Sequence, residues 1–562
     1  MHRRVFAASV ALLCAAMLAG CVSIPSSGAV NAGNSAVVEE NPELDIIAAG
    51  PKVDGTPQEI VQGFMAAAVS PRNNYQVARQ FLTTTFADEW QADAAATIDA
   101  GERDFTAIDD SSMVVEVTPV ASLTAGGQYA ASESRAAIPL PYRLEQVDGQ
   151  WRISEAPPGV VIDEANFASV FRKHALYFFD PGYRYLVPDL RWFAGRDSVQ
   201  TSIVKALLTG PAEWLDPGVV SAFPDGVRLD PDAVPVDGTV ASVDLSGAAF
   251  DDLLTVQRMQ EQLDESLVGK VRNVTTVTLL LNGLEQDVPD LPGQVVVNPR
   301  VAQRPVVYDG ASFGYLATSG EGIEPIPGLS AEVEELAPTG AALGPDAESA
   351  AVRSAAGVSL VVAGEAAVLL DPRADLVVPA MDGAGYVWSV PRASPDQLVA
   401  FAPDGTDLPL DVPWGGSSIA AIEVSRDSTR LIALLGDGAR TQFVVASIEH
   451  DAEGRPLALG PVALRLGDTA GTPLDVAWLD ASNVASLTAL PDGTTRLVTQ
   501  EIGGFASDRQ GPDGGVLVDG GNSITDVRVL TSAGALNVRS GVGWQVRAPN
   551  LNIRFTAVQQ PN

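Results

Sequence analysis

The second half of the chain carries the pattern that most restricts its fold. Beyond Pro292 the helical periodicity of apolar residues ends, and short β-rich runs alternate with Asp-Gly, Gly-Asp and Pro-Asp turns. Runs such as Val424–Ser428 and Val527–Thr531 belong to a series that recurs at intervals of 36 to 53 residues, and a four-stranded propeller blade needs about 40–50. Residues 295–562 are therefore predicted to form an all-β propeller of about five to seven blades. Strands within Val306–Ile326 are expected to close the ring with C-terminal strands.

Residues 165–290 show the pattern of a mixed α and β domain. Apolar runs predict strands, and apolar residues at helical spacing predict two helices between them. Ser198 is the expected cap of the first helix, Gly210-Pro211 ends it, and the second helix carries one apolar stripe. The predicted strands are Leu176–Phe179, Leu190–Phe193, Thr239–Leu245 and Val274–Leu281, the first helix runs to Leu208, and the stripe is Val256, Met259, Leu263 and Leu267.

Helices precede strands in residues 56–160, which predicts an α+β domain with a curled antiparallel sheet. Thr56, Pro57 and Glu59 form a capping box with proline at the first helical position, and Asp148-Gly149 is a two-residue hairpin turn. The order of elements resembles that of cone-shaped nuclear-transport-factor-like domains. The predicted elements are a helix that buries Ile60, Val61, Phe64, Met65 and Ala68, a helix over Tyr75–Leu82, and strands Met113–Val117, Arg135–Pro139, Tyr142–Val147 and Trp151–Ser154.

The N-terminus has the features of a cleaved leader. A cationic tip, Arg3-Arg4, precedes an apolar run up to Ala16, which is too short for a membrane span of ~20 residues. Leu18-Ala19-Gly20-Cys21 is similar to the lipobox of bacterial lipoproteins, in which the peptide is cut before a cysteine that becomes lipidated. The resemblance implies a lipoprotein signal peptide over residues 1–20 and acyl chains, such as palmitate, on Cys21.

Residues 21–55 are rich in Ser, Gly, Asn and Pro and are predicted to be a flexible tether. The chain has a formal net charge of −35, which disfavours nucleic acid and anionic lipid headgroups as partners. Cys14 lies in the predicted leader and Cys21 is predicted to carry lipid, so no cysteine is left for a disulfide or a thiolate metal site.

Four short motifs in the middle region are similar, in order, to those of the GerMN domain of sporulation and germination proteins. They are Leu176–Phe179, Leu207–Pro211, Val243–Ser246 and the closing strand from Val274 to Asn282-Gly283. The resemblance implies an interaction module without catalytic chemistry. Because this copy lies between two other domains, a binding surface used elsewhere in that family is expected to be covered here.

A lipobox, a GerMN-like domain and a C-terminal propeller, in this order, resemble the LpqB lipoproteins of actinobacteria over nearly the whole mature chain. The resemblance implies a lipid-anchored protein on the extracytoplasmic face of the cell membrane. It also implies a non-catalytic regulator whose partner is the extracytoplasmic domain of an MtrB-like sensor histidine kinase, in a two-component system linked to cell-envelope homeostasis and division. Two alternatives remain open: an envelope glycan-binding or hydrolytic protein that uses the propeller channel, and a general envelope-assembly scaffold.

Two short stretches of the sequence match catalytic motifs, but the other elements that each motif requires are missing. Gly310–Gly314 matches G-x-S-x-G around Ser312, but a strand-like run follows it where a nucleophile elbow needs a helix. We therefore expect a tight β-turn. Ser202–Lys205 matches S-x-x-K, but the sequence contains no K-T-G, so Lys205 is interpreted as a solvated position on a helix.

Metal and cofactor motifs are similarly incomplete. His174 and His450 belong to different predicted domains, which makes a two-histidine metal site improbable. Asp230-Pro231-Asp232 and Asp237-Gly238 lack the spacing of an EF-hand, so solvated loop carboxylates are the default interpretation. The sequence therefore predicts no catalytic residue, no bound metal and no cofactor.

The lipid anchor is directly testable. Cys21→Ala removes the only thiol that the lipobox offers, so the variant is expected to lose acylation, to move from the membrane fraction to the soluble fraction, and to change its electrophoretic mobility. Fractionation and metabolic labelling with a fatty acid measure this outcome. Unchanged partitioning and mobility of the variant would contradict a lipid on Cys21.

Overall fold

The computed structural model describes residues 48–561, except Glu133, Asp197, Asp251, Ala439, Asp468 and Thr469. The predicted signal peptide over 1–20, the proposed lipidation site Cys21 and most of the predicted tether lie outside the described residues. Residues 48–55 contain no helix or strand. Within the described part of the chain, no helix combines the length and the apolar character that crossing a membrane requires.

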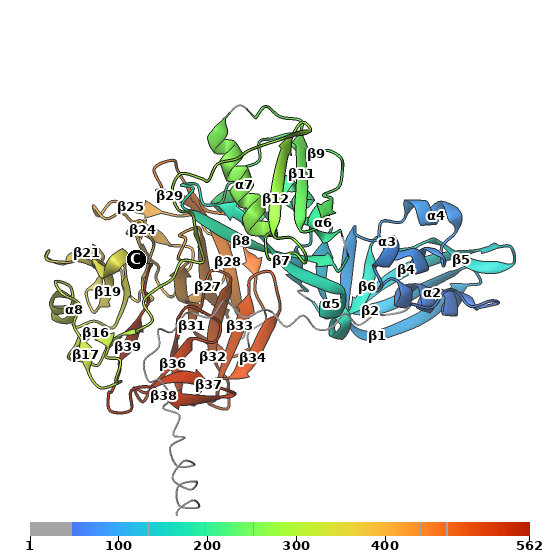
Figure 1. Cartoon of the computed structure of the whole chain (residues 1–562). Coiled ribbons are helices and arrows are strands. Elements are labelled where there is room, and N and C mark those ends of the chain that lie inside the picture. The colour runs from blue at the N-terminus through green and yellow to red at the C-terminus, as the bar shows by residue number, and fades with distance from the viewer. Residues whose placement is uncertain are drawn as a thin grey trace, which may run out of the picture. The chain divides into compact units, whose positions relative to one another are not determined.

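The N-terminal domain is an α+β unit built on a six-stranded sheet (Figure 1). The strand order is β5-β4-β2-β1-β6, with β3 paired to β2; β6 is parallel to β1, and the other pairs are antiparallel. The elements are α2 (Pro57–Ala67), α3 (Arg72–Arg79), α4 (Thr84–Glu89), β1 (Ala95–Asp109), β2 (Ser112–Thr124), β3 (Tyr129–Ala131), β4 (Ile138–Val147), β5 (Gln150–Glu155), β6 (Val160–Asp163) and α5 (Glu164–Val170).

Aromatic side chains fill the core of this domain. The ring of Phe64 on α2 packs edge-on against Trp90 with 5.1 Å between centroids, and Trp90 contacts Tyr75 at 5.8 Å. Tyr142 on β4 lies 6.4 Å from Phe64 on the sheet side. All four residues are buried and belong to one hydrophobic cluster, which forms the core of this domain.

The local signals at both ends of this domain are confirmed. The Thr56 hydroxyl accepts a hydrogen bond from the Glu59 N–H at 3.3 Å, and the Thr56 N–H donates to the Glu59 carboxylate at 3.0 Å, which is the reciprocal capping box. Asp148 and Gly149 have φ angles of 52° and 78° and join Val147 to its strand partner Gln150, as a type I′ hairpin requires.

The division of residues 135–147 into two strands is wrong, because the structure has the single strand β4 over Ile138–Val147. Pro139 and Pro141 lie where the two expected strands meet. The Leu144 N–H donates to the Ser111 oxygen across the β2–β4 ladder. Because hydrogen-bonded and non-hydrogen-bonded pairs alternate in such a ladder, both prolines occupy positions that make no hydrogen bond to β2. Strand β5 pairs only from Arg143 onward, so the prolines have their missing N–H on an open edge, where they are tolerated.

The middle domain contains two sheets and two long helices. Helix α7 connects the parallel strands β11 and β12, and β7 pairs antiparallel with β8. The elements are β7 (Phe171–Phe179), β8 (Tyr185–Ala194), α6 (Val199–Thr209), the 3₁₀ turn η1 (Asp216–Gly218), β9 (Arg228–Leu229), β10 (Val236–Asp237), β11 (Val240–Ser246), α7 (Leu253–Leu267), β12 (Thr276–Leu281), β13 (Leu284–Glu285) and β14 (Val296–Val297).

Both predicted helices of the middle domain are confirmed. Helix α6 ends at Gly210 with φ at 105°, whereas its expected cap Ser198 makes no side-chain capping bond. The four stripe residues of α7, Val256, Met259, Leu263 and Leu267, are all buried. The helical periodicity therefore located the face that packs on the sheets.

The C-terminal region forms six sheets of at least four strands each within the described residues, as a propeller of six blades. The first three blades contain β15 (Val306–Tyr308), β16 (Phe313–Leu316), β17 (Ile323–Glu324) and β39 (Phe555–Ala557); β18 (Gly340–Leu343), β19 (Ser349–Ser354), β20 (Gly357–Val362) and β21 (Val368–Asp371); and β22 (Ala380–Met381), β23 (Val387–Ser389), β24 (Val399–Phe401) and β25 (Asp407–Pro409). Helix α8 (Ser330–Glu335) and the 3₁₀ turn η2 (Pro345–Ala347) lie in connections.

The other three blades are longer. They contain β26 (Ser418–Val424), β27 (Arg430–Asp437), β28 (Arg440–His450), β29 (Pro456–Leu459) and β30 (Leu464–Arg465); β31 (Thr472–Trp478), β32 (Asn483–Ala489), β33 (Thr495–Glu501) and β34 (Ala506–Gln510); and β35 (Gly515–Gly520), β36 (Val527–Thr531), β37 (Leu536–Ser540) and β38 (Gly543–Val546). Strands β18, β22, β26, β31, β35 and β39 contact one another in sequence around the ring, so they are the inner strands.

The ring closes as the sequence predicts. Strand β39, near the C-terminus, pairs antiparallel with β15, and Val306 lies opposite Ala557 in this ladder. Tyr308 and Phe555 are also strand partners, and their rings lie 5.3 Å apart. The first blade thus combines strands from both ends of the propeller sequence, which prevents the ring from opening at that point.

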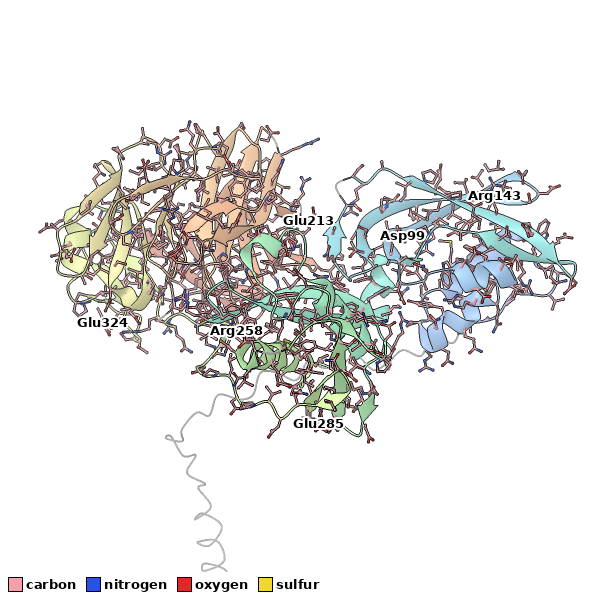
Figure 2. All side chains as sticks on the ribbon, turned by 90° about the horizontal axis from the view of Figure 1, so that it is seen from above. Asp99, Arg143, Glu213, Arg258, Glu285 and Glu324 are labelled. Atoms are coloured by element: carbon pink, nitrogen blue, oxygen red, sulfur yellow. The ribbon has the colours of Figure 1, made fainter. Side chains whose placement is uncertain are left out.

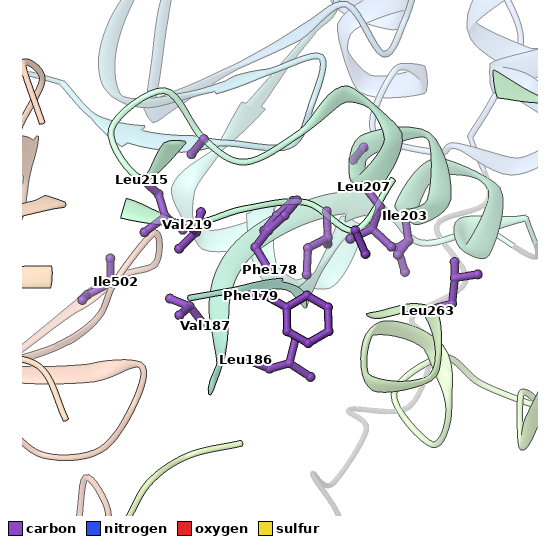
Figure 3. Packing of buried hydrophobic residues seen from close by; sticks show 14 of the residues in the cluster. Phe178, Phe179, Leu186, Val187, Ile203, Leu207, Leu215, Val219, Leu263 and Ile502 are labelled. Carbon is purple, nitrogen blue, oxygen red and sulfur yellow. The ribbon is translucent and has the colours of Figure 1, made fainter. Parts of the chain in front are cut away.

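The middle domain and the propeller share one hydrophobic core. Phe178, Ile203 and Leu215 belong to the same buried cluster as Ile432 and Phe443 of the fourth blade. Ile502, in the loop after β33, joins the cluster as well (Figure 3). One face of the middle domain therefore packs against the propeller; whether the family's binding surface lies on this face stays a prediction.

A second contact links the loop between β33 and β34 to the N-terminal domain. The Phe505 ring packs against Tyr129, Phe167 and Trp192 with centroid distances of 5.1, 5.4 and 5.3 Å. The Trp192 indole N–H donates a hydrogen bond of 2.9 Å to the backbone oxygen of Gly503. One short loop of the propeller thus contacts both preceding domains.

Candidate functional site

The G-x-S-x-G string lies in a hairpin turn, as the sequence predicts. Ser312 connects β15 to β16, in which Tyr308 and Phe313 are paired. The Asp309 carboxylate accepts hydrogen bonds from the backbone N–H groups of Ser312 at 2.8 Å and Ala311 at 2.9 Å. Because a strand follows the serine, the geometry is that of an Asx-stabilised turn and not of a nucleophile elbow.

The S-x-x-K string is a surface feature of α6. The Lys205 ammonium lies 2.7 Å from the Asp232 carboxylate, and the two side chains are 44% and 79% exposed. An ion pair with this exposure contributes little to stability and offers no desolvated base. The interpretation of Lys205 as a solvated position is confirmed.

The two histidines lie in different domains. His174 lies on β7 and His450 at the end of β28. Burial lowers the pKa of His174 to about 4 and also lowers that of His450, so both are neutral at physiological pH. In the described part of the chain, no three His, Cys, Asp or Glu side chains are grouped to hold a metal ion. The charged residues that Figure 2 labels, among them Asp99, Glu213 and Glu324, lie at separate places and do not gather at one site.

The closest approach to a catalytic constellation is a group of carboxylates on three inner strands of the propeller: Glu423 on β26, Asp475 on β31 and Asp519 on β35. Burial raises the pKa of Glu423 well above its ordinary value and raises that of Asp475 to about 7. Burial also raises the pKa of Asp519. Each of these carboxylates is further disfavoured in its charged form by at least one other acidic group.

These carboxylates connect blades. The Trp478 N–H of the fifth blade donates to Glu423 of the fourth at 3.2 Å, and the Val518 N–H of the sixth blade donates to Asp475 of the fifth at 2.9 Å. Asp519 accepts a hydrogen bond from the Arg528 guanidinium at 3.0 Å. Each carboxylate thus satisfies an N–H or a guanidinium group between or within blades, which is a structural role.

Arginine and amide side chains complete this network. The Arg426 guanidinium donates to the backbone oxygens of Trp478, at 3.4 Å, and Gly521, and to the Asn522 side chain at 3.2 Å. From the C-terminal segment, the buried Gln560 amide donates to the Met381 oxygen of the third blade at 2.6 Å. The C-terminal segment therefore occupies the inner side of the ring at this end, where a channel ligand would need space.

Sequence reasoning did not single out these groups, although a signal was present. Glu423, Asp475 and Asp519 each lie within a run that is otherwise apolar, such as Ile419 to Val424. A lone acid in a fully buried strand indicates a specific partner, because an unpaired buried charge is costly. In a sequence so rich in Asp-containing turns, the local pattern around these two aspartates does not distinguish them from turn residues.

Comparison with known proteins assigns the family. The N-terminal domain of lipoprotein LpqB matches residues 50–168, the sporulation and spore germination domain matches residues 175–287, and the LpqB β-propeller domain matches residues 314–553. The two LpqB models together cover more than half of the chain. The protein is thus a multidomain lipoprotein with a germination-type domain before a propeller.

Relatives named lipoprotein LpqB match over most of their length. The chain is 29% identical to that of Bifidobacterium longum over 79% of this chain and 78% of the relative, and 27% identical to that of Streptomyces coelicolor over 78% of each. It is 26% identical to that of Mycolicibacterium smegmatis over 84% of each. The chain belongs to the LpqB family of actinobacterial lipoproteins. Membership in a lipoprotein family implies a membrane-anchored protein of the cell envelope.

Solved structures give only a distant match. The streptogramin B lyase structure is 12% identical, with a TM-score of 0.31 over 47% of this chain and 90% of that chain. No conclusion about function follows from a similarity at this level.

The Asp475 carboxylate predicts a pH dependence of stability. Its pKa is about 7 in the folded chain and near 3.8 when unfolded, so the folded chain keeps a proton that the unfolded chain loses between these values. Its contribution to the free energy of unfolding therefore falls as the pH rises from about 4 to 7. Asp475→Asn keeps an acceptor for the Val518 N–H and cannot ionise, so it is expected to flatten this slope and to raise the melting temperature at pH 8.

Thermal melts of the wild type and the variant from pH 5 to 8 measure this effect, with the exposed Asp513→Asn as control. An Asp475→Asn variant that keeps the wild-type slope, or that is less stable than the wild type at pH 8, contradicts the assignment.

Proposed function

We propose that this protein is a non-catalytic interaction module of the cell envelope. Cys21 anchors it at the extracytoplasmic face of the membrane, and its partner is the extracytoplasmic domain of an MtrB-like sensor histidine kinase of a two-component system linked to envelope homeostasis and division. Membership in the LpqB family supports the anchor and the envelope location. The partner is inferred from the resemblance of the domain order to that family.

The observation that carries the non-catalytic part is the use of the inner-strand carboxylates. Glu423, Asp475 and Asp519 are the strongest candidates for acid–base chemistry in the described part of the chain, because their pKa values are raised. Their oxygens accept bonds from Trp478, Val518 and Arg528, respectively. Groups engaged in this way brace the ring, because their oxygens are taken up by protein donors.

The same region weakens the alternative of a glycan-binding or hydrolytic channel. The Gln560 side-chain amide donates to the Met381 oxygen of the third blade. The C-terminal segment therefore lies against the inner strands of the ring. A general assembly scaffold would differ from a kinase regulator in having many partners. No residue of the described structure favours that function specifically.

A regulator of this kind acts through differential affinity. If the protein binds one signalling state of the kinase more tightly, the kinase shifts toward that state by the difference in binding free energy. Equal affinity for both states would shift nothing. The acyl anchor confines both proteins to one surface and so raises their effective concentration.

The experiment is co-reconstitution of the acylated chain with the full-length sensor kinase in one population of vesicles. We expect a change in kinase autophosphorylation that saturates with the amount of the protein, and a much weaker change for Cys21→Ala at the same total concentration. A sensor kinase with an unrelated ectodomain is the control. An identical response of both kinases, no response at all, or turnover of an envelope substrate by the purified chain would contradict the proposal.

A further inference from the structure

A groove of about 410 Å³ lies between the outer parts of the fifth and sixth blades. Strands β33 and β34 form one wall, and β37 with the start of β38 forms the other. The groove-lining residues that matter here are Thr499, Ser507, Arg509, Arg539, Val542 and Trp544. None of them takes part in the inner-strand network of the propeller.

The first notable property of the groove is an open strand edge. Strand β34 is the last strand of its sheet. Gly511 donates its N–H to the Thr495 oxygen at 2.8 Å, and bonded pairs alternate in an antiparallel ladder, so Arg509 and Ser507 hold the bonded positions. The backbone groups of Asp508 and Gln510 consequently face away from β33.

Contact with the sixth blade is consistent with this register. The Trp544 indole N–H donates to the Gln510 oxygen at 3.1 Å, which requires that this oxygen face outward. Trp544 thus bonds one outward carbonyl at the end of β34. The outward N–H and C=O groups of Asp508 lie one step further along the same edge and offer the pattern that an additional strand would continue.

The second property is charge. The chain as a whole has a net charge of −35, yet two arginines, Arg509 and Arg539, line this groove. The only acidic residue of the lining, Asp508, is paired with Arg496 at 2.7 Å. Neither lining arginine forms an ion pair among the described residues, so the groove presents two uncompensated positive charges.

The third property is an apolar surface beside these charges. Val542, at the tip of the β37–β38 turn, is fully exposed at 105% of its reference area. The Trp544 ring is partly exposed and held in place by its bond to Gln510. Arg539 and Trp544 are strand partners, so their side chains lie on the same face of the sixth blade and line the groove together. Successive side chains of an extended segment alternate in direction, so every second side chain of a bound segment can point into this groove.

We propose that this groove binds an extended acidic segment of a partner protein, which pairs with β34 as an additional strand. Backbone pairing supplies affinity along the edge, and Glu or Asp side chains of the segment bind Arg509 and Arg539. An anionic glycan would satisfy the arginines but would leave the strand edge unused, so the peptide is favoured. The inference rests on the proposed function, because it names a docking surface for a protein partner.

The groove also lies next to the contact between domains. Strand β34 begins at Ala506, directly after Phe505, whose ring packs against Trp192 and Phe167. A strand bound to β34 would therefore lie directly beside the segment that contacts the N-terminal domain. This position gives a partner access to the domain contact without entering the ring.

The test uses the soluble chain from residue 22 onward and three labelled peptides. The first alternates Glu and Val, the second alternates Lys and Val, and the third has the Glu–Val sequence with N-methylated backbone amides that cannot pair as a strand. Fluorescence anisotropy is expected to show binding of the first peptide only, with an affinity that falls as salt is raised. Hydrogen exchange is expected to slow at residues 506–510 in that complex.

Charge reversal supplies the matched variants. The double variant Arg509→Glu, Arg539→Glu is expected to lose about tenfold or more in affinity for the Glu–Val peptide, whereas Arg135→Glu, an exposed arginine of the N-terminal domain, keeps it. Absence of binding, equal binding of the N-methylated peptide, or insensitivity to the double variant overturns the inference. Displacement of the peptide by polygalacturonate at lower concentration would assign the groove to an anionic glycan instead.

The failure of this inference is distinguishable from that of the proposed function. If the sensor ectodomain binds the chain but neither the double variant nor the Glu–Val peptide weakens that complex, the groove is not the docking surface and the proposed function stands. If the peptide binds as expected but the ectodomain does not bind, the groove stands and the proposed kinase partner is wrong.

Discussion

The continuous hydrophobic core between the middle domain and the propeller is the constraint on which the rest of the structure depends. Leu215 and Val219 flank the 3₁₀ turn η1, which lies against β28 of the fourth blade. Gly218 makes this approach possible, because a Cβ at its position would lie 2.8 Å from the Thr429 oxygen and 2.9 Å from the Ser447 Cβ. Any side chain there would push the turn away and expose apolar surface on both sides. The middle domain therefore cannot bind a partner through this face.

Periodic features were predictable from the sequence, whereas contacts between domains were not. The α7 stripe, the capping box at Thr56 and the closure of the ring by strands near Val306 follow from local spacing and turn chemistry, and the structure has all three. The long strand β1 was missed because most of its outer half is exposed and polar, so it lacks an alternating pattern. The single strand β4 was not predictable, because a strand accepts two prolines only where their missing N–H groups face an open edge. The order of strands in the sheet defines that edge, and the local sequence does not.

The candidate site shows the same limit. A sequence can mark Glu423, Asp475 and Asp519 as acids in apolar runs, but the partner of each comes from a residue elsewhere in the fold, such as Val518 of the next blade. Phe505 is similarly a single aromatic residue after Gly503-Gly504, with no local pattern to show that its ring enters another domain. Long-range contacts of this kind decide which acids brace the ring and which surfaces stay free.

Heating the chain while hydrogen exchange is followed tests the shared core most directly. Phe178→Ala removes a fully buried ring of the middle domain, at a cost of about 3–5 kcal/mol. If the middle domain and the fourth and fifth blades are one cooperative unit, the variant loses protection in β11 and in β31 at the same lowered temperature. Early loss of protection in β11, with β31 still melting at its wild-type temperature, would show that the two domains fold independently and contradict the account.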